Sequence, residues 1–186
     1  MQNGQEELDG FEEFLDLWVE YLASQEERHV EGLIQEAQSL MNNEEKELEN
    51  AKLYARQYPS LYKQYLKKHE KADDDQKFFG IGWKALSEVP VDSRERSQIA
   101  LLTAGYALRI GKPDKAEECW VEAFRSERNP VHFLRIFIES RDYSRYEKEI
   151  RDICSSMSKK EDADYDTILF LNGRFREVLE EGMNVK

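Results

Sequence analysis

The residues with the clearest capacity for chemistry lie in a basic, tyrosine-rich segment, AKLYARQYPSLYKQYLKKHEK, at positions 51–71. Tyrosine rings can stack on nucleic-acid bases while lysine and arginine side chains hold the phosphates. That chemistry needs both residue types on the same face of a helix. At helical spacing the tyrosines fall roughly opposite the cations Lys52, Arg56, Lys63 and Lys67. We therefore expect a buried tyrosine face with a solvated basic face, and keep a nucleic-acid-associated module as the alternative.

Carboxylates gather near the start of the chain. Paired carboxylates can act as general acid and base, or hold a metal ion, when they converge in a cleft. Here they alternate with the apolar positions of one expected helix and are predicted to face solvent: Glu12, Glu13, Asp16 and Glu20. The acidic run 73–75 lacks the Gly and Glu positions of a calcium loop, and helix capping explains it.

The histidines and cysteines show no catalytic or metal-ligating spacing. His29, His69 and His132 are scattered, without an HExxH pattern. Cys119 and Cys154 form no CxxC pair and are predicted to pack as small hydrophobic side chains. The sequence also lacks a nucleophile elbow and a phosphate-binding glycine loop. We therefore expect no catalytic residues, no cofactor, no metal ion and no enzymatic activity.

The charge of the chain is strongly uneven. Its formal net charge of −12 argues against generic nucleic-acid binding by the whole chain. Residues 1–50 hold 15 acidic and 2 basic residues, whereas residues 51–71 hold 6 basic and 1 acidic. The acidic and basic segments could match each other internally, or they could mark two binding surfaces. With two cysteines and no secretory or membrane-spanning signal, a reduced cytoplasmic compartment is expected.

The elements that must position these residues follow from one spacing. In SQIALLTAGYALRIGKPDKAEECWVEAFRSERNP (97–130), Ala116, Trp120 and Ala123 match the packing pattern of a tetratricopeptide-like helical hairpin. Small residues let two amphipathic helices approach closely, and the turn is expected near Gly111–Pro113. Such hairpins cannot bury their apolar faces alone, so they stack into arrays that bind other proteins. An all-α, tetratricopeptide-like stack of hairpins (an α-solenoid) is therefore predicted.

Helical periodicity extends over the rest of the chain, and no strand pattern competes with it. Helix pairs are predicted at 93–110 with 113–126, at 130–140 with 144–157, and on both sides of a turn at Gly173. The polar stretch 71–77 is the candidate boundary between an N-terminal helical layer (1–72) and the repeat region (73–186), which are expected to form one continuous structural unit. The helix at 75–88 contains two glycines, which are expected where another helix approaches closely.

Polar residues on the first helix of the best hairpin are the candidate partner-binding set. In a solenoid one face of each repeat lines a concave surface, and exposed side chains there make the contacts. The candidates are Arg94, Gln98, Thr103, Tyr106 and Arg109. Trp18, Trp83 and Trp120 are predicted to belong to the core, together with the apolar stripe of the first helix, which includes Phe11, Phe14, Leu15, Trp18, Tyr21 and Leu22.

Two longer segments, FGIGWKALSEVP and RSQIALLTAGYALRIGKPDKAEECWVEAFRSERNPVHFLRIF, lie within residues 79–137, and the chain ends on ILFLNGRFREVLEEGMNVK. These segments resemble the helical region downstream of the zinc finger in bacterial SWIM zinc-finger family proteins. The resemblance covers about the last 110 residues. It implies a helical interaction scaffold that is a fragment of a longer protein. The CxC and CxH motifs of the finger have no counterpart here, so no zinc ligand is carried over.

The sequence as a whole predicts a non-enzymatic scaffold that binds a protein or peptide of unknown identity. Nucleic acid would be reached only through the full-length protein or, in the alternative, through segment 51–71. A third reading, an enzyme or small-molecule sensor, would require a deep pocket with convergent ionisable residues. No membrane association is expected, and the chain is expected to be a monomer or a weak dimer, the latter if its last helix exposes an apolar face.

Overall fold

The protein is all-helical throughout the part of the chain that the computed structural model describes, residues 10–25, 29–41 and 43–183. Eleven α-helices and one short 3₁₀ helix make up this part, which contains no strand, so the predicted all-α class is confirmed. The helices are α1 (Phe11–Ala23), α2 (Val30–Met41), α3 (Glu44–Leu53), α4 (Ser60–Lys68), α5 (Asp75–Glu88), α6 (Arg94–Arg109), α7 (Pro113–Ser126), α8 (Pro130–Glu139), η1 (Tyr143–Arg145), α9 (Glu147–Ser155), α10 (Tyr165–Leu171) and α11 (Phe175–Met183).

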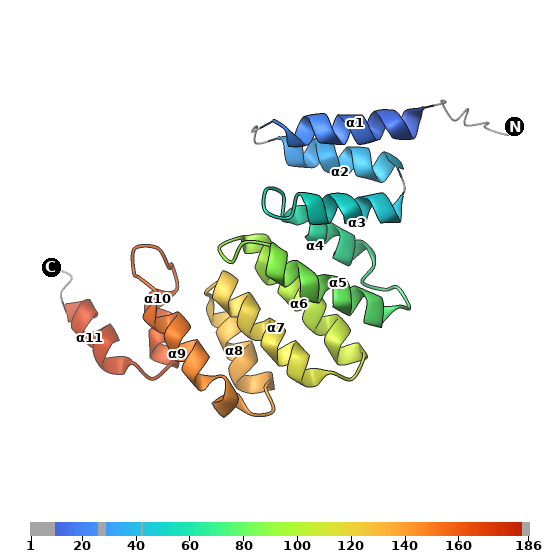
Figure 1. The fold of residues 1–186 in the computed structure, drawn as a ribbon. Coiled ribbons are helices and arrows are strands. Elements are labelled where there is room, and N and C mark those ends of the chain that lie inside the picture. Colours follow the sequence, from blue (N-terminus) through green and yellow to red (C-terminus); the bar gives the residue numbers. More distant parts are fainter. Residues whose placement is uncertain (1–9, 26–28, 42, 184–186) are drawn as a thin grey trace, which may run out of the picture.

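Neighbouring helices pack in pairs that follow one another along the chain. Figure 1 shows α1 at one end of the molecule and α11 at the other. Helix α6 packs against α4, α5 and α7, and α8 packs against α7 and α10. A continuous apolar core runs from α1 to α10. Helices α6, α7 and α8 are therefore each covered by at least two neighbours.

Two glycine turns close the hairpins that the sequence predicted. Gly111, after α6, has a φ of +70°, and the Lys112 N–H donates to the Ala107 carbonyl at 2.8 Å. Gly173, after α10, has a φ of +77° with the equivalent bond from Arg174 to Leu169 at 2.9 Å. This pattern satisfies the last carbonyls of a helix and favours glycine because the left-handed conformation penalises a Cβ atom. Both predicted turns are confirmed.

Small residues bring α6 and α7 together, as the hairpin spacing predicts. Ala104 and Ala107 on α6 are fully buried, as are Ala116 and Ala123 on α7. Trp120 is buried beside them. Alanine needs little room and has the highest helix propensity, so it allows close backbone approach without weakening either helix. This close contact fixes α7, and through α7 it fixes the position of α8.

A second close approach lies between α5 and α6. A Cβ atom added to Gly82 would overlap the Thr103 hydroxyl and lie 3.1 Å from the Thr103 Cβ. The Thr103 hydroxyl is itself held in place, because it donates to the Ile99 carbonyl at 2.7 Å. The prediction that the glycines of this helix lie where another helix backbone approaches is met at Gly82 only by a side chain, since the nearest atoms all belong to the Thr103 side chain of α6. It is wrong for Gly80, where an added Cβ atom meets nothing within 4 Å.

Contacts cross the boundary expected at residues 71–77. Asp74 caps α5 by accepting a hydrogen bond from the Lys77 N–H at 3.0 Å, so the polar stretch does begin a helix. Across this boundary, the Tyr106 hydroxyl of α6 donates to the Leu66 carbonyl of α4 at 2.7 Å. The Tyr62 hydroxyl of α4 donates to Glu88 at the end of α5. Buried hydrogen bonds therefore join the N-terminal layer to the helices that follow.

The apolar stripe predicted for the first helix is only partly buried. Leu15 and Leu22 belong to the core, but the large aromatic side chains of α1 are exposed. Trp18 and Trp83 are likewise exposed, and only Trp120 of the three tryptophans lies in the core. The expectation that all three tryptophans are core residues is wrong for two of them, because periodicity identifies an apolar face but not what covers it.

Candidate partner-binding face

Three of the five predicted contact residues lie at the surface of α6. Arg94 and Gln98 are exposed near its start, and Arg109 is exposed at its end. Arg94 lies 3.6 Å from a Glu127 oxygen. Arg109 is held more firmly, because its guanidinium contacts the Asp75 carboxylate at 2.8 Å. These three side chains are accessible to a partner.

The other two predicted contact residues, Thr103 and Tyr106, are not accessible. Both are fully buried, and the expectation that they belong to an exposed face is wrong. Thr103 points toward Gly82 of α5, and Tyr106 reaches α4. Burial raises the pKa of Tyr106 to about 12, which fits a neutral hydroxyl that donates a hydrogen bond. Helix α6 lies between three neighbours, so few of its positions remain at the surface.

Helix α8 presents the most apolar accessible face near this region. Asn129 caps the helix by accepting from the His132 N–H at 2.9 Å, and Pro130 occupies its first position. One side of the helix is buried through His132, Phe133 and Ile136. The opposite side is also apolar, and we call it the α8 face. It consists of the exposed residues Val131, Phe137 and Ile138, together with Leu134, which is half-buried and packs against the core.

The α8 face is an ordered surface with a cleft beside it. Val131 is 65% exposed and Ile138 is 71% exposed. Phe137 turns toward Tyr143, and the two rings meet edge to face with centroids 5.2 Å apart. These rings line a cleft of about 600 Å³ that α9 and the turn at Gly173 complete. A large apolar side chain of a partner could therefore enter this preformed cleft beside the α8 face.

The charged residues of this cleft are already paired. Arg151 contacts Glu147 at 2.6 Å, and Arg174 is paired with Glu177. The cleft is therefore a poor candidate for the convergent, unpaired ionisable groups that an enzyme or sensor would require. Its shape and aromatic lining favour apolar contact instead.

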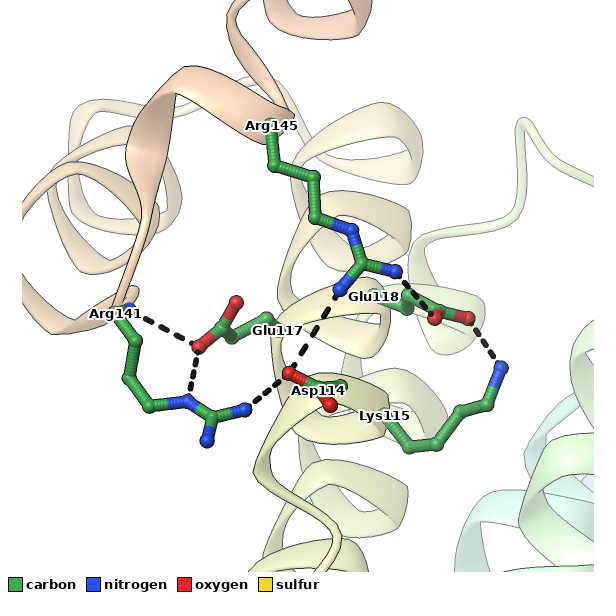
Figure 2. A network of polar contacts seen from close by, with 6 residues as sticks. All are labelled: Asp114, Lys115, Glu117, Glu118, Arg141 and Arg145. Carbon is green, nitrogen blue, oxygen red and sulfur yellow. Dashed lines mark hydrogen bonds and ion pairs between the residues drawn. The ribbon is translucent and has the colours of Figure 1, made fainter.

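An ion-pair network holds the corner after α8 against α7. Figure 2 shows Glu117 at one end of the network, where one carboxylate oxygen accepts from the Arg141 backbone N–H at 3.0 Å and from Arg141 Nε at 3.3 Å. Arg141 also pairs with Asp114. Arg145 of η1 lies 3.4 Å from Glu118, which in turn contacts Lys115 at 2.7 Å. The network fixes the direction in which the chain leaves α8, and it thereby positions the cleft.

Glu117→Ala is expected to lower the free energy of unfolding by about 1 to 3 kcal/mol, because it removes a buried acceptor that satisfies a backbone N–H and a guanidinium. Glu118→Ala is the matched control, since its pairs are more exposed and are expected to contribute less than about 1 kcal/mol. Urea denaturation followed by far-UV circular dichroism measures both. Equal losses in the two variants would show that the burial of Glu117 does not strengthen its contacts.

The basic segment 51–71 exposes most of its positive charges, but its tyrosine rings are not available for stacking on bases. Tyr58, Tyr62 and Tyr65 are buried, and Tyr54 is half-buried, so the predicted tyrosine face belongs to the core. Burial raises the pKa of Tyr62 and Tyr65, and their hydroxyls donate to Glu88 and Glu44. Of the candidate nucleic-acid contacts, Lys52, Arg56 and Lys67 are exposed and Lys63 is half-exposed.

The thiols and the one buried histidine are shielded from solvent. Burial raises the pKa of Cys119 to about 12 and that of Cys154 to about 11, so both behave as the predicted small hydrophobic residues. Burial lowers the pKa of His132, whose Nε2 lies 3.5 Å from Glu127. Among the described residues, no three His, Cys, Asp or Glu side chains are grouped as metal ligands.

Comparisons with known proteins identify no relative. No family model, no curated protein and no solved structure matches the chain. The resemblance to the SWIM zinc-finger family therefore stays a prediction. Within the described part of the chain, no helix has both the length and the apolar character needed to cross a membrane.

Proposed function

We propose that this protein is a non-enzymatic interaction scaffold, built as a tetratricopeptide-like stack of helical hairpins, which binds an amphipathic segment of another protein on the α8 face. The observation that carries the proposal is that α8 is apolar on both sides and that Val131, Phe137 and Ile138 on the second side are exposed. An exposed apolar surface on an ordered helix is typical of an interaction site. Of the exposed α6 candidates Arg94, Gln98 and Arg109, Arg94 contacts Glu127, shortly before the start of α8, and is the polar candidate for orienting the bound segment.

Binding would bury the exposed side chains of the α8 face and fill the cleft beside it. Fully burying a Val, Leu, Ile or Phe side chain contributes roughly 1.5 to 3 kcal/mol, from which the entropy of association is subtracted. An amphipathic helix would present apolar side chains at every third or fourth position, which suits a helical ridge. The rigid support of α8 by α7 and α10 keeps the ordering cost on this side low.

The test is selection of peptides of about 15 residues from a displayed library, followed by binding to two matched variants. Ile138→Glu places a charge in the α8 face, and Leu53→Glu places one on α3, at a residue of similar exposure (68% against 71%). We expect Ile138→Glu to weaken the selected peptides at least about tenfold and Leu53→Glu to leave them unchanged. Selection of no peptide, or equal binding to both variants, would refute the proposal.

Membership of the SWIM zinc-finger family and a cytoplasmic location belong to the same proposal. The coding sequence on either side of this segment tests the family. A CxC…CxH pair upstream would support it, and its absence there would remove the reason for naming that family. The nucleic-acid alternative now rests on charge alone, through Lys52, Arg56 and Lys67, because the tyrosines that would stack bases are in the core.

A further inference from the structure

Helix α1 carries a second apolar surface, at one end of the molecule and distant from the α8 face (Figure 1). We call it the α1 aromatic face, and it consists of Phe11, Phe14, Leu17, Trp18 and Tyr21. The rings of Phe14 and Trp18 are stacked with centroids 6.4 Å apart, and those of Trp18 and Tyr21 with centroids 5.5 Å apart. Leu17, beside this row, is 66% exposed. The residues form a continuous row along one side of the helix.

This surface is not required for packing within the described part of the chain. Leu15, Val19, Leu22 and Ala23 form a separate buried side of α1. Figure 1 shows α1 as the outermost helix at its end of the molecule, with α2 on its inner side. Among the described residues no other helix buries this row of side chains. A continuous exposed apolar surface on a helix is typical of an interaction site.

The charge around this face identifies the kind of partner. Residues 10–25 and 29–41, which contain α1 and α2, hold six carboxylates and no lysine or arginine. Asp16 lies 3.3 Å from Lys46 of α3. Glu12, Glu13 and Glu20 have no ion pair among the described residues. At about 100° per residue, Glu13 and Glu20 border the α1 aromatic face on the side of Leu17.

We propose that the α1 aromatic face binds a basic amphipathic helix of a partner protein. The apolar side of that helix would cover the aromatic row, and its lysine or arginine side chains would meet Glu13 and Glu20. A helix laid along α1 makes apolar contacts at three- and four-residue spacing, which is the spacing of Phe11, Phe14, Trp18 and Tyr21. Opposite charge also accelerates association and disfavours acidic competitors.

The same charges argue against two other occupants. A second copy of α1 would bring carboxylates against carboxylates, which opposes a symmetric contact between two such faces. An anionic lipid surface attracts basic helices, so it would repel a helix pair without lysine or arginine. A basic helix is the occupant whose charge and apolar pattern both complement the surface. This site is independent of the α8 face, so either can fail without the other.

The probe is a pair of synthetic amphipathic peptides of about 18 residues, one built from leucine and lysine and the other from leucine and glutamate in the same pattern. Isothermal titration calorimetry with the intact chain is expected to show binding of the lysine peptide, weakened in about 500 mM salt relative to about 50 mM. The glutamate peptide is expected not to bind. Equal affinity for both peptides would overturn the proposal.

Two variants localise the binding. Phe14→Ser with Leu17→Ser is expected to weaken the lysine peptide at least about tenfold, whereas Leu53→Ser, at similar exposure, leaves it unchanged. Glu13→Lys with Glu20→Lys is expected to weaken binding and reduce its salt dependence, whereas Asp152→Lys with Glu161→Lys, both exposed far from α1, is not. Far-UV circular dichroism confirms that each variant is folded.

The remaining outcomes also decide the matter. Unchanged binding by the Phe14 and Leu17 variant would place the peptide elsewhere and overturn the proposal. So would binding of anionic phospholipid vesicles in preference to the lysine peptide. A dimer in sedimentation velocity that the same substitutions dissociate would replace the partner helix with a second copy.

Discussion

Tyr106→Ala is expected to lower the free energy of unfolding by roughly 3 to 5 kcal/mol, a large share of the stability of a domain of this size. Tyr106 is fully buried, and the centroid of its ring lies 5.7 Å from the ring centroid of Phe78 on α5. Its hydroxyl donates to the Leu66 carbonyl on α4 at 2.7 Å. One side chain of α6 thus joins the helices on both sides of the predicted boundary. Urea denaturation followed by far-UV circular dichroism measures the effect.

Tyr106→Phe separates the two contributions of this residue. It keeps the ring contacts and removes only the hydrogen bond to Leu66, so the expected loss is about 0.5 to 1.5 kcal/mol. If Tyr106→Ala lies within about 1 kcal/mol of the unsubstituted protein, the residue is not in the core. In that case Tyr106 would again be a candidate for the partner-binding surface.

Gly82→Ala is expected to destabilise the protein by roughly 1 to 3 kcal/mol, although alanine has the higher helix propensity by about 1 kcal/mol. The added Cβ atom would overlap the Thr103 hydroxyl, which the Ile99 carbonyl holds in place. Gly80→Ala in the same helix is the control. Its Cβ atom meets no neighbour within 4 Å, so only the propensity gain of about 1 kcal/mol is expected.

A double-mutant cycle with Thr103→Ala tests whether this contact is the cause. Thr103→Ala removes the hydroxyl and the methyl group that a Cβ atom at position 82 would meet. Of these neighbours only the Cβ atom of residue 103 remains, 3.1 Å from the added Cβ atom. In that background the cost of Gly82→Ala is expected to fall below about 1 kcal/mol, with a coupling energy of at least about 1 kcal/mol. Additive effects in the cycle would mean that α5 and α6 do not meet at these residues.

The sequence predicts the local structure of this protein well. The expected helix at 75–88 coincides with α5, and the best hairpin corresponds to α6 and α7 with the turn at Gly111. Caps, turn glycines and helical periodicity act within a few residues, so they can be read from the chain. The same local signals place Asp74 at the start of a helix and Gly173 at the end of another.

The sequence predicts less well which positions remain accessible. Thr103 and Tyr106 are polar and were expected at the surface, but α4 and α5 cover them. Phe14 and Trp18 are apolar and were expected in the core, but they are exposed on α1. The α8 face was missed for the same reason. Periodicity identifies an apolar side of a helix, whereas its exposure depends on helices that are distant in the sequence.

The most direct test of the scaffold function is site-specific photo-crosslinking to a selected peptide. A photoreactive benzophenone side chain replaces Ile138 on the α8 face and, in a control, Lys84, which is exposed on α5. A binding scaffold that uses the α8 face should give a crosslinked product from position 138 and none from position 84. Crosslinking from neither position, or equally from both, would contradict binding at the α8 face.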